Sequence, residues 1–386
     1  MMVSAVRHGT PMRSVARRFH VSLNTVQHWV RRAQGQRLSR VVDWTDRPAG
    51  CRRSPHRTPA FLKDRVLALW TSLKTDSALG EYGAEAIHRT IVDEGTIPPP
   101  TVRTIGRILA RRGAFDGRRR TRHPAPSKGW YLPDVVSGLA ELDSFDIVEG
   151  LIIRGGFEVE VLNVSSLLGG LCGSWPASLI TAKMAVKCII AHWQRVGLPD
   201  YAQFDNDTIF QGAHHWPDSF GRVIRLCLGL DVAPVFAPPQ ETGFQAAIEN
   251  YNGRWQAKVW RRFEHAGYPQ LRERSDAFVD ALNYRNRARR DASPERRPWP
   301  STWQMNLQAP LQGRIIYLRR TDEQGRVSML EHRFPVSPCW AHRLVRAELS
   351  FAKKRITFYS LRRRAYDEQD VLNEVCYEPP KKRFSE

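Results

Sequence analysis

The chain has 386 residues, and 42% of them are apolar, so it is long enough for two or three domains with sizeable cores. Its formal net charge of +20 is unevenly distributed. Residues 1–128 hold 25 Lys and Arg against 9 Asp and Glu, residues 129–300 hold 18 against 20, and residues 301–386 hold 16 against 10. A basic head and tail around an acid-rich middle favour a polyanionic partner over a uniformly soluble basic surface.

The six cysteines are scattered and form no Cys-x-x-Cys pair, which argues against a disulfide framework and a zinc ribbon. No signal-peptide pattern follows the first basic residue. Residues 161–182 carry no charge and could span a bilayer by length alone, but glycines and Pro176 interrupt them. The expectation is a cytoplasmic protein with no membrane partner.

Residues 1–36 have the pattern of a helix-turn-helix unit. Thr10-Pro11 can start one helix, and Ser22 can cap a second after a short turn. The exposed face of the second helix would carry amide and basic side chains, which suit base edges and phosphates in a major groove. The candidates for DNA contact are Asn24, Thr25, Gln27, His28, Arg31 and Arg32. An ordinary helical hairpin with a polar face is the alternative.

Residues 61–113 predict a second helix-turn-helix unit, with helices at 61–73, 84–94 and 101–112. Arg103 and Arg107 would lie on the solvent side of the last helix. Basic linkers are expected at 37–60 and 114–130, and each adjoins a helical unit. Arg118, Arg119 and Arg120 in the second linker are candidates for phosphate contact, although a solvated charge run is the usual reading of such a segment.

Residues 131–292 change to an alternation of strand and helix, which predicts a mixed sheet covered by helices. Strands are expected at 141–148, 157–165, 171–175, 201–204 and 232–236, and helices at 181–196, 218–228, 245–263 and 276–290.

Acidic residues lie where such a sheet would bring them together. The first strand holds Asp143 and Asp146, and a charge there is costly unless a cation meets it. Asp205 directly follows a strand, and Glu249 lies early in the last long helix. Three converging carboxylates can hold two Mg²⁺ ions, although any one of them could instead form a structural ion pair.

Three blocks of the sequence carry a family resemblance: Phe145-Asp146-Ile147, residues 203–210 and residues 237–250. They resemble the core of the DDE transposase and retroviral-type integrase superfamily, and most of all bacterial insertion-sequence transposases. The resemblance implies an α/β ribonuclease H-like core in which Asp146, Asp205 and Glu249 are the catalytic, metal-binding triad for Mg²⁺ or Mn²⁺. Asp146 is preferred to Asp143 because apolar residues flank it.

The sequence departs from the family pattern at several positions. Asn163 stands where an acid is common, and Asp207 stands where a glycine is common. The basic residue that often follows the glutamate is missing, because Gly253 and Gln256 occupy its helical phase. Arg254 and Lys258 are the nearest cations and are included among the candidates for DNA contact.

Strands expected at 313–318, 327–336, 342–348 and 355–359 predict a small all-β barrel over residues 310–362. Lys353, Lys354 and Arg355 could contact phosphate there or guard an exposed edge strand. Residues 379–386 are expected to be disordered.

The resemblance implies a transposase that binds the ends of a mobile element in double-stranded DNA, cleaves a phosphodiester and joins the freed end to target DNA. It also implies a homo-oligomer in the active complex and a place on the nucleoid. Two rivals are a sequence-specific DNA-binding regulator with an inactive nuclease core and a nuclease for RNA–DNA hybrids. The presence of all three acids weighs against the first rival, and two duplex-reading units weigh against the second.

Overall fold

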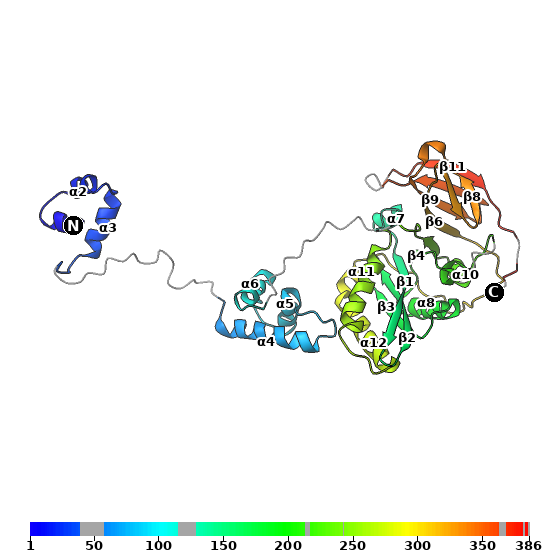
Figure 1. Cartoon of the computed structure of the whole chain (residues 1–386), viewed down its shortest axis with the longest axis horizontal. Coiled ribbons are helices and arrows are strands. Elements are labelled where there is room, and N and C mark those ends of the chain that lie inside the picture. Colours follow the sequence, from blue (N-terminus) through cyan, green and yellow to red (C-terminus); the bar gives the residue numbers. More distant parts are fainter. Residues whose placement is uncertain are drawn as a thin grey trace. The chain divides into compact units, whose positions relative to one another are not determined.

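The computed structural model describes residues 1–38, 58–114, 129–212, 217–241, 243–362, 368–380 and 383–384 (Figure 1). Contacts within the chain divide it into two units, Met1–Ala60 and Phe61–Glu386, and each is described by itself. In the described ranges, every helix is too short or too polar to cross a bilayer.

The first unit contains three short helices: α1 (Met2–Arg7), α2 (Met12–Arg18) and α3 (Leu23–Arg32). The predicted cap of α3 is confirmed, because the Thr25 amide donates to Ser22 Oγ at 3.1 Å. Helix α1 was not expected from the sequence. Its Arg7 donates hydrogen bonds to the carbonyls of Ala33 and Gln36 beyond the end of α3, which ties the start of the unit to its end.

The second unit begins with the three predicted helices: α4 (Ala60–Asp76), α5 (Ala84–Asp93) and α6 (Val102–Arg111). Thr101 caps α6 as expected, since its Oγ1 accepts from the Thr104 amide at 3.3 Å. The apolar faces of the three helices meet in one core of their own, formed by Val66, Leu69, Ile87, Ile91, Ile105, Ile108 and Leu109.

A mixed sheet follows the short helix α7 (Pro133–Val136), and it confirms the predicted α/β core. Its central strand β1 pairs with β2 in antiparallel and with β4 in parallel, and β3 and β5 lie outside these two. The strands are β1 (Leu142–Ile153), β2 (Phe157–Ser166), β3 (Cys172–Ala177), β4 (Tyr201–Phe204) and β5 (Ala233–Phe236).

Helices cover both faces of this sheet (Figure 1). On one face, α8 (Ala182–Val196), α9 (Thr208–Gln211) and α10 (Arg222–Gly229) pack against aromatic residues of β1 and β4. On the other face lie α11 (Ala246–Trp255), the π-helical turn η1 (Gln256–Trp260) and α12 (Tyr268–Arg285), which α13 (Arg287–Asp291) follows. The single helix expected over 245–263 is therefore α11 with a π-helical end.

The expectation of a separate small barrel at the C-terminal end is wrong. The strands β6 (Arg314–Arg320), β9 (Leu344–Ser350), β10 (Arg355–Ser360) and β11 (Val371–Cys376) extend the core sheet in the order β5-β6-β9-β10-β11. The reason lies in β6, whose consecutive residues Ile315, Ile316 and Tyr317 are apolar and buried on both faces. Tyr317 stacks on Phe236 of β5, with ring centroids 5.3 Å apart.

Two smaller expectations for the tail are also corrected. Residues 327–336 form a hairpin of β7 (Arg326–Met329) and β8 (His332–Pro335), not one strand, and Pro338–Trp340 form a 3₁₀ turn, η2, after it. Within the stretch expected to be disordered, Phe384 is placed by contacts: its amide donates to Gln308 Oε1 at 3.1 Å, and Arg222 and Arg225 lie over its ring.

Candidate active site

Asp146 and Asp205 are brought together by the parallel pairing of β1 and β4. Ser144 pairs with Gln203 in this ladder, and the next residues, Phe145 and Phe204, stack with ring centroids 5.3 Å apart. One further step along both strands places Asp146 beside Asp205. Because side chains alternate between faces, both carboxylates lie on the face opposite the stacked rings.

Helix α11 covers that face and carries Glu249 in its first turn. One turn later, Asn252 Nδ2 donates to Asp146 Oδ2 at 2.7 Å. Asn163, the partner of Asp146 across the β1–β2 ladder, donates from its Nδ2 to Asn252 Oδ1 at 2.8 Å. This chain of amides fixes α11 against the sheet, so Asn163 has a structural function.

Asp205 and Glu249 both act on Asp146 through their charges. Burial raises the pKa of Asp146 to about 6, and the neighbouring charges of Asp205 and Glu249 contribute to the increase. The pKa of Asp205 is also raised, first by burial and then by Asp207 and Glu149. Crowded carboxylates of this kind are stabilised when a cation lies between them.

Asp143 lies on the opposite face of β1 and is fully buried there. It accepts two hydrogen bonds from Arg296, one from Ser166 and one from the Trp193 indole. Burial alone would raise the pKa of Asp143, but Arg296 outweighs burial and lowers it to about 2. The positive group that a charged strand residue needs is thus present, and it leaves Asp143 with no oxygen facing Asp205.

The loop after β4 is held by its own polar groups. The Asp207 amide donates to Asp205 Oδ1 at 3.0 Å, and Asp207 Oδ1 caps α9 by accepting from the Ile209 amide at 2.7 Å. Asn206 Oδ1 accepts from the buried Arg319 of β6 at 2.8 Å. Sequence reasoning missed Arg319; the only signal was an arginine directly after the apolar run of its strand.

The donor set suits a hard divalent cation, because three carboxylates supply only oxygen ligands. Among the described residues, no group of three His, Cys, Asp or Glu side chains already forms a metal site, and Glu249 is exposed to solvent. What fits a divalent cation is therefore the chemistry of the ligands. Asp146 and Asp205 are half-buried carboxylates side by side on neighbouring strands, and Glu249 acts on Asp146 through its charge.

The candidates for DNA contact fall into three groups. On α3, Asn24, His28 and Arg31 are exposed, whereas Thr25, Gln27 and Arg32 are partly covered. On α6, Arg103 and Arg107 are exposed. Arg118, Arg119 and Arg120 lie outside the described residues.

Arg254 and Lys258 contact another part of the protein, and their contact with DNA stays a prediction. Arg254 forms an ion pair with Glu81 at 3.5 Å, and Lys258 Nζ donates to the Gly80 carbonyl at 3.0 Å. Arg285 and Arg89 also pair with Glu81. The loop between α4 and α5 thus binds cationic side chains of α11, η1 and α12.

No family model matches the sequence. Among solved structures, the chain is similar to one in the simian T-cell lymphotropic virus intasome bound to a PP2A regulatory subunit, with 13% identity, 71% of this chain and 88% of that chain covered, and a TM-score of 0.32. The catalytic core of BIV integrase is 17% identical, with 36% of this chain and 80% of that chain covered and a TM-score of 0.27. The HTLV-2 integrase core in complex with magnesium is 11% identical, with 42% of this chain and 87% of that chain covered and a TM-score of 0.27. All three TM-scores are below 0.5, so these similarities carry no argument about this chain. Its fold is described by its own strand order.

Proposed function

We propose that the chain is a DDE-type transposase, which cleaves a phosphodiester at the end of a mobile DNA element and joins that end to target DNA. The observation that carries this proposal is the row formed by Asp146 and Asp205 beneath α11, with Glu249 acting on Asp146 through its charge. These are the three acids on which the resemblance to the transposase and integrase superfamily rests.

Each acid has an assigned role in the proposal. Asp146 and Asp205 supply inner oxygen ligands from the sheet, and Glu249 closes the site from the helix. Asn252 and the Asp207 amide orient the two aspartates through the hydrogen bonds they donate. Two Mg²⁺ or Mn²⁺ ions held there would activate an attacking oxygen and stabilise the leaving oxygen in an in-line displacement.

The DNA-binding part of the proposal rests on charge. The exposed faces of α3 and α6 bear amide and guanidinium groups, and the 1–128 segment holds 25 Lys and Arg against 9 Asp and Glu. Such surfaces bind the phosphate backbone, while amides read base edges. Joining two ends requires at least two active sites, so a homo-oligomer on double-stranded DNA is part of the proposal.

The test is metal-dependent strand cleavage by the full chain, using supercoiled plasmid with Mg²⁺ or Mn²⁺. We expect nicking in wild type and a loss of at least about a hundredfold in Asp146→Asn, because that change removes an inner ligand. Glu158→Gln is the matched control, since Glu158 is an exposed acid on β2. It should cleave as wild type does.

Two results would count against the proposal. Asp146→Asn protein that is folded and cleaves at the wild-type rate would remove Asp146 from the site. Wild-type protein that binds DNA but never cleaves it with either metal would favour the regulator with an inactive core.

A further inference from the structure

Arg319 is a buried arginine of β6 whose guanidinium group is held by neutral acceptors. It is 8% exposed, and burial lowers its pKa to about 10, so it is still a cation at neutral pH. Its Nη1 donates to the carbonyls of Leu318 and Ala237, at 2.9 and 3.3 Å, and its Nη2 donates to Asn206 Oδ1 at 2.8 Å. No Asp or Glu among the described residues pairs with it. Because a cation buried without an anion destabilises a fold, these contacts indicate a function for Arg319 other than stability.

Arg319, Asn206 and Ala237 form a closed set of hydrogen bonds. Asn206 Nδ2 donates to the Ala237 carbonyl at 2.7 Å, while Arg319 donates both to that carbonyl and to Asn206 Oδ1. The Ala237 amide in turn donates to the Phe204 carbonyl at 3.0 Å, which ties the set to the end of β4. Both ends of the Asn206 side-chain amide are therefore held, directly after Asp205 in the chain.

The closed set lies on the face of the sheet opposite to the acidic row. The Arg319 guanidinium lies over the Tyr317 ring, 5.2 Å from its centroid, next to the aromatic core that α8 and α9 cover. Phe204 packs in the same core. Since Phe204 and Asn206 are both fixed toward this face, Asp205 between them projects toward α11.

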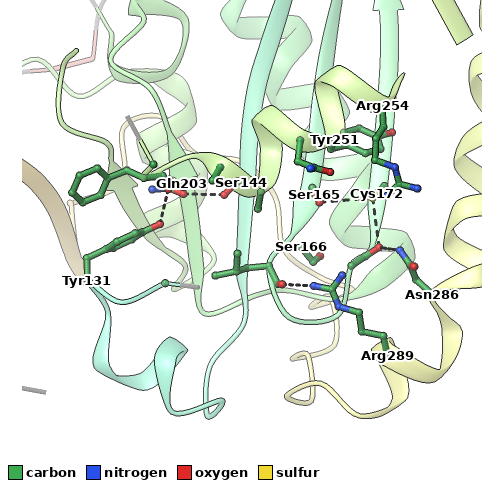
Figure 2. Close-up of a pocket in the computed structure, with 18 residues that line it drawn as sticks. Tyr131, Ser144, Ser165, Ser166, Cys172, Gln203, Tyr251, Arg254, Asn286 and Arg289 are labelled. Carbon is green, nitrogen blue, oxygen red and sulfur yellow. Dashed lines mark hydrogen bonds between the residues drawn. The ribbon is translucent and has the colours of Figure 1, made fainter. Parts of the chain in front are cut away.

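The strand before Asp205 is held from the other face. Ser144 Oγ donates to Gln203 Oε1 at 2.9 Å, and the Tyr131 hydroxyl forms a hydrogen bond with the same side chain. Figure 2 shows these three residues at one side of a pocket that β1, β4 and α11 line. Asp205 therefore follows one anchored residue, Gln203, and precedes another, Asn206. The second anchor depends on Arg319, which is 113 positions away in the sequence.

We propose that Arg319 is a positioning residue for Asp205 and acts through Asn206. The inference rests on the proposed function, in which Asp205 is a metal ligand. Gln211 also donates to Asn206 Oδ1, but at 3.2 Å, so Arg319 makes the shorter bond. Without Arg319, Asn206 is released from β6 and the Asp205 carboxylate can turn away from Asp146. The strands that extend the core sheet thereby support its acidic row, as groups behind a metal ligand commonly do.

The test is Mn²⁺ binding by the full chain without DNA, followed by electron paramagnetic resonance. Arg319→Met removes the hydrogen-bond donors at similar length and should weaken Mn²⁺ binding about tenfold, because the ligand loses its orientation. Arg346→Met is the matched control. Arg346 of the neighbouring strand β9 is also 8% exposed, and it lies over the Tyr359 ring, away from the loop after β4. This control should bind Mn²⁺ as wild type does, even where it loses as much stability as Arg319→Met.

Asn206→Ala tests the route of the effect. Asn206 is a partly buried loop residue, so this variant keeps the inference testable if Arg319→Met does not fold. It should weaken Mn²⁺ binding by about the same factor as Arg319→Met. The double variant should bind no more weakly than either single variant, because both changes remove the same contact.

Three results would overturn the inference alone. They are wild-type Mn²⁺ affinity in folded Arg319→Met or Asn206→Ala protein, a loss in Arg346→Met as large as in Arg319→Met, and losses that multiply in the double variant. Wild-type protein that binds no Mn²⁺ would instead overturn the proposed metal site, and the inference with it.

Discussion

Arg296 holds the buried carboxylate of Asp143 through two hydrogen bonds, of 3.0 and 2.6 Å, from the loop after α13 to the first strand of the sheet. Because of this pair, Asp143 and Asp146 have different roles although they lie three residues apart on one strand. Asp143 stabilises the fold on the α8 face, and Asp146 remains available on the α11 face. The contribution of the Arg296–Asp143 ion pair to stability can be tested by substitution.

Asp143→Ala should destabilise the chain by about 3–5 kcal/mol, because it leaves Arg296 buried without its anion. The measurement is urea unfolding followed by tryptophan fluorescence. Glu158→Gln, which removes an exposed charge from the neighbouring strand, should change the free energy of unfolding by less than about 0.5 kcal/mol. An Asp143→Ala cost as small as that of Glu158→Gln would show that the ion pair does not support the fold.

His192 should make stability fall in mildly acidic solution. Burial lowers its pKa from 6.5 to about 4, so the unfolded chain binds a proton more readily than the folded one. The contribution of neutral His192 is fully present above pH 6.5 and is lost as pH falls to about 4, at a cost of roughly 3 kcal/mol. Asp143 titrates in a lower window, because its stabilisation is lost only as pH falls from its unfolded value toward about 2.

The check is the melting temperature of wild type and His192→Gln from pH 7.5 to 4. Asp146, whose pKa is raised to about 6, acts in the opposite direction in both proteins, because the folded chain binds its proton more readily as pH falls. The difference between the two curves therefore isolates His192, and wild type should lose stability relative to the variant as pH falls from 6.5 to 4. Equal slopes in the two proteins would assign the acid sensitivity to other groups.

Glu81 should restrain DNA binding by the core. Burial favours its neutral form, but Arg285, Arg254 and Arg89 outweigh burial and lower its pKa, so it is an anion that occupies three cations. Glu81→Gln should therefore raise the affinity for random duplex DNA severalfold at low salt. Glu85→Gln is the control, because it removes the same charge from an exposed position on α5. Fluorescence anisotropy at several salt concentrations measures both variants, and equal gains would mean that only net charge matters.

Sequence preference should depend on α3. Asn24→Ala with Gln27→Ala should flatten the base preferences that the full chain shows in selection from random duplexes. Arg103→Ala should instead weaken all duplexes about equally, because a phosphate contact carries no sequence information. Unchanged preferences in the α3 variant would move sequence reading to another part of the chain.

Local signals made much of the fold predictable. The strand at 201–204 and the caps Ser22 and Thr101 are found where the sequence places them, since each depends on neighbouring residues. The merged sheet was not predictable in this way, because Val235 pairs with Ile316, far along the chain from it, and no local pattern connects the two strands. The pairing of Arg254 with Glu81 has the same character, as no local pattern connects the two positions. For the acids, the apolar flanks of Asp146 favoured it over Asp143, and the structure shows that Arg296 pairs with Asp143.

The most direct measurement is Mn²⁺ binding by the full chain, followed by electron paramagnetic resonance without DNA. Wild-type protein should bind Mn²⁺, and Asp146→Asn and Asp205→Asn should each weaken that binding by at least about tenfold, because each removes an oxygen ligand from the row. Glu158→Gln should bind as wild type does. Folded Asp146→Asn and Asp205→Asn proteins that both retained wild-type Mn²⁺ affinity would contradict the central claim that these two carboxylates form the metal site.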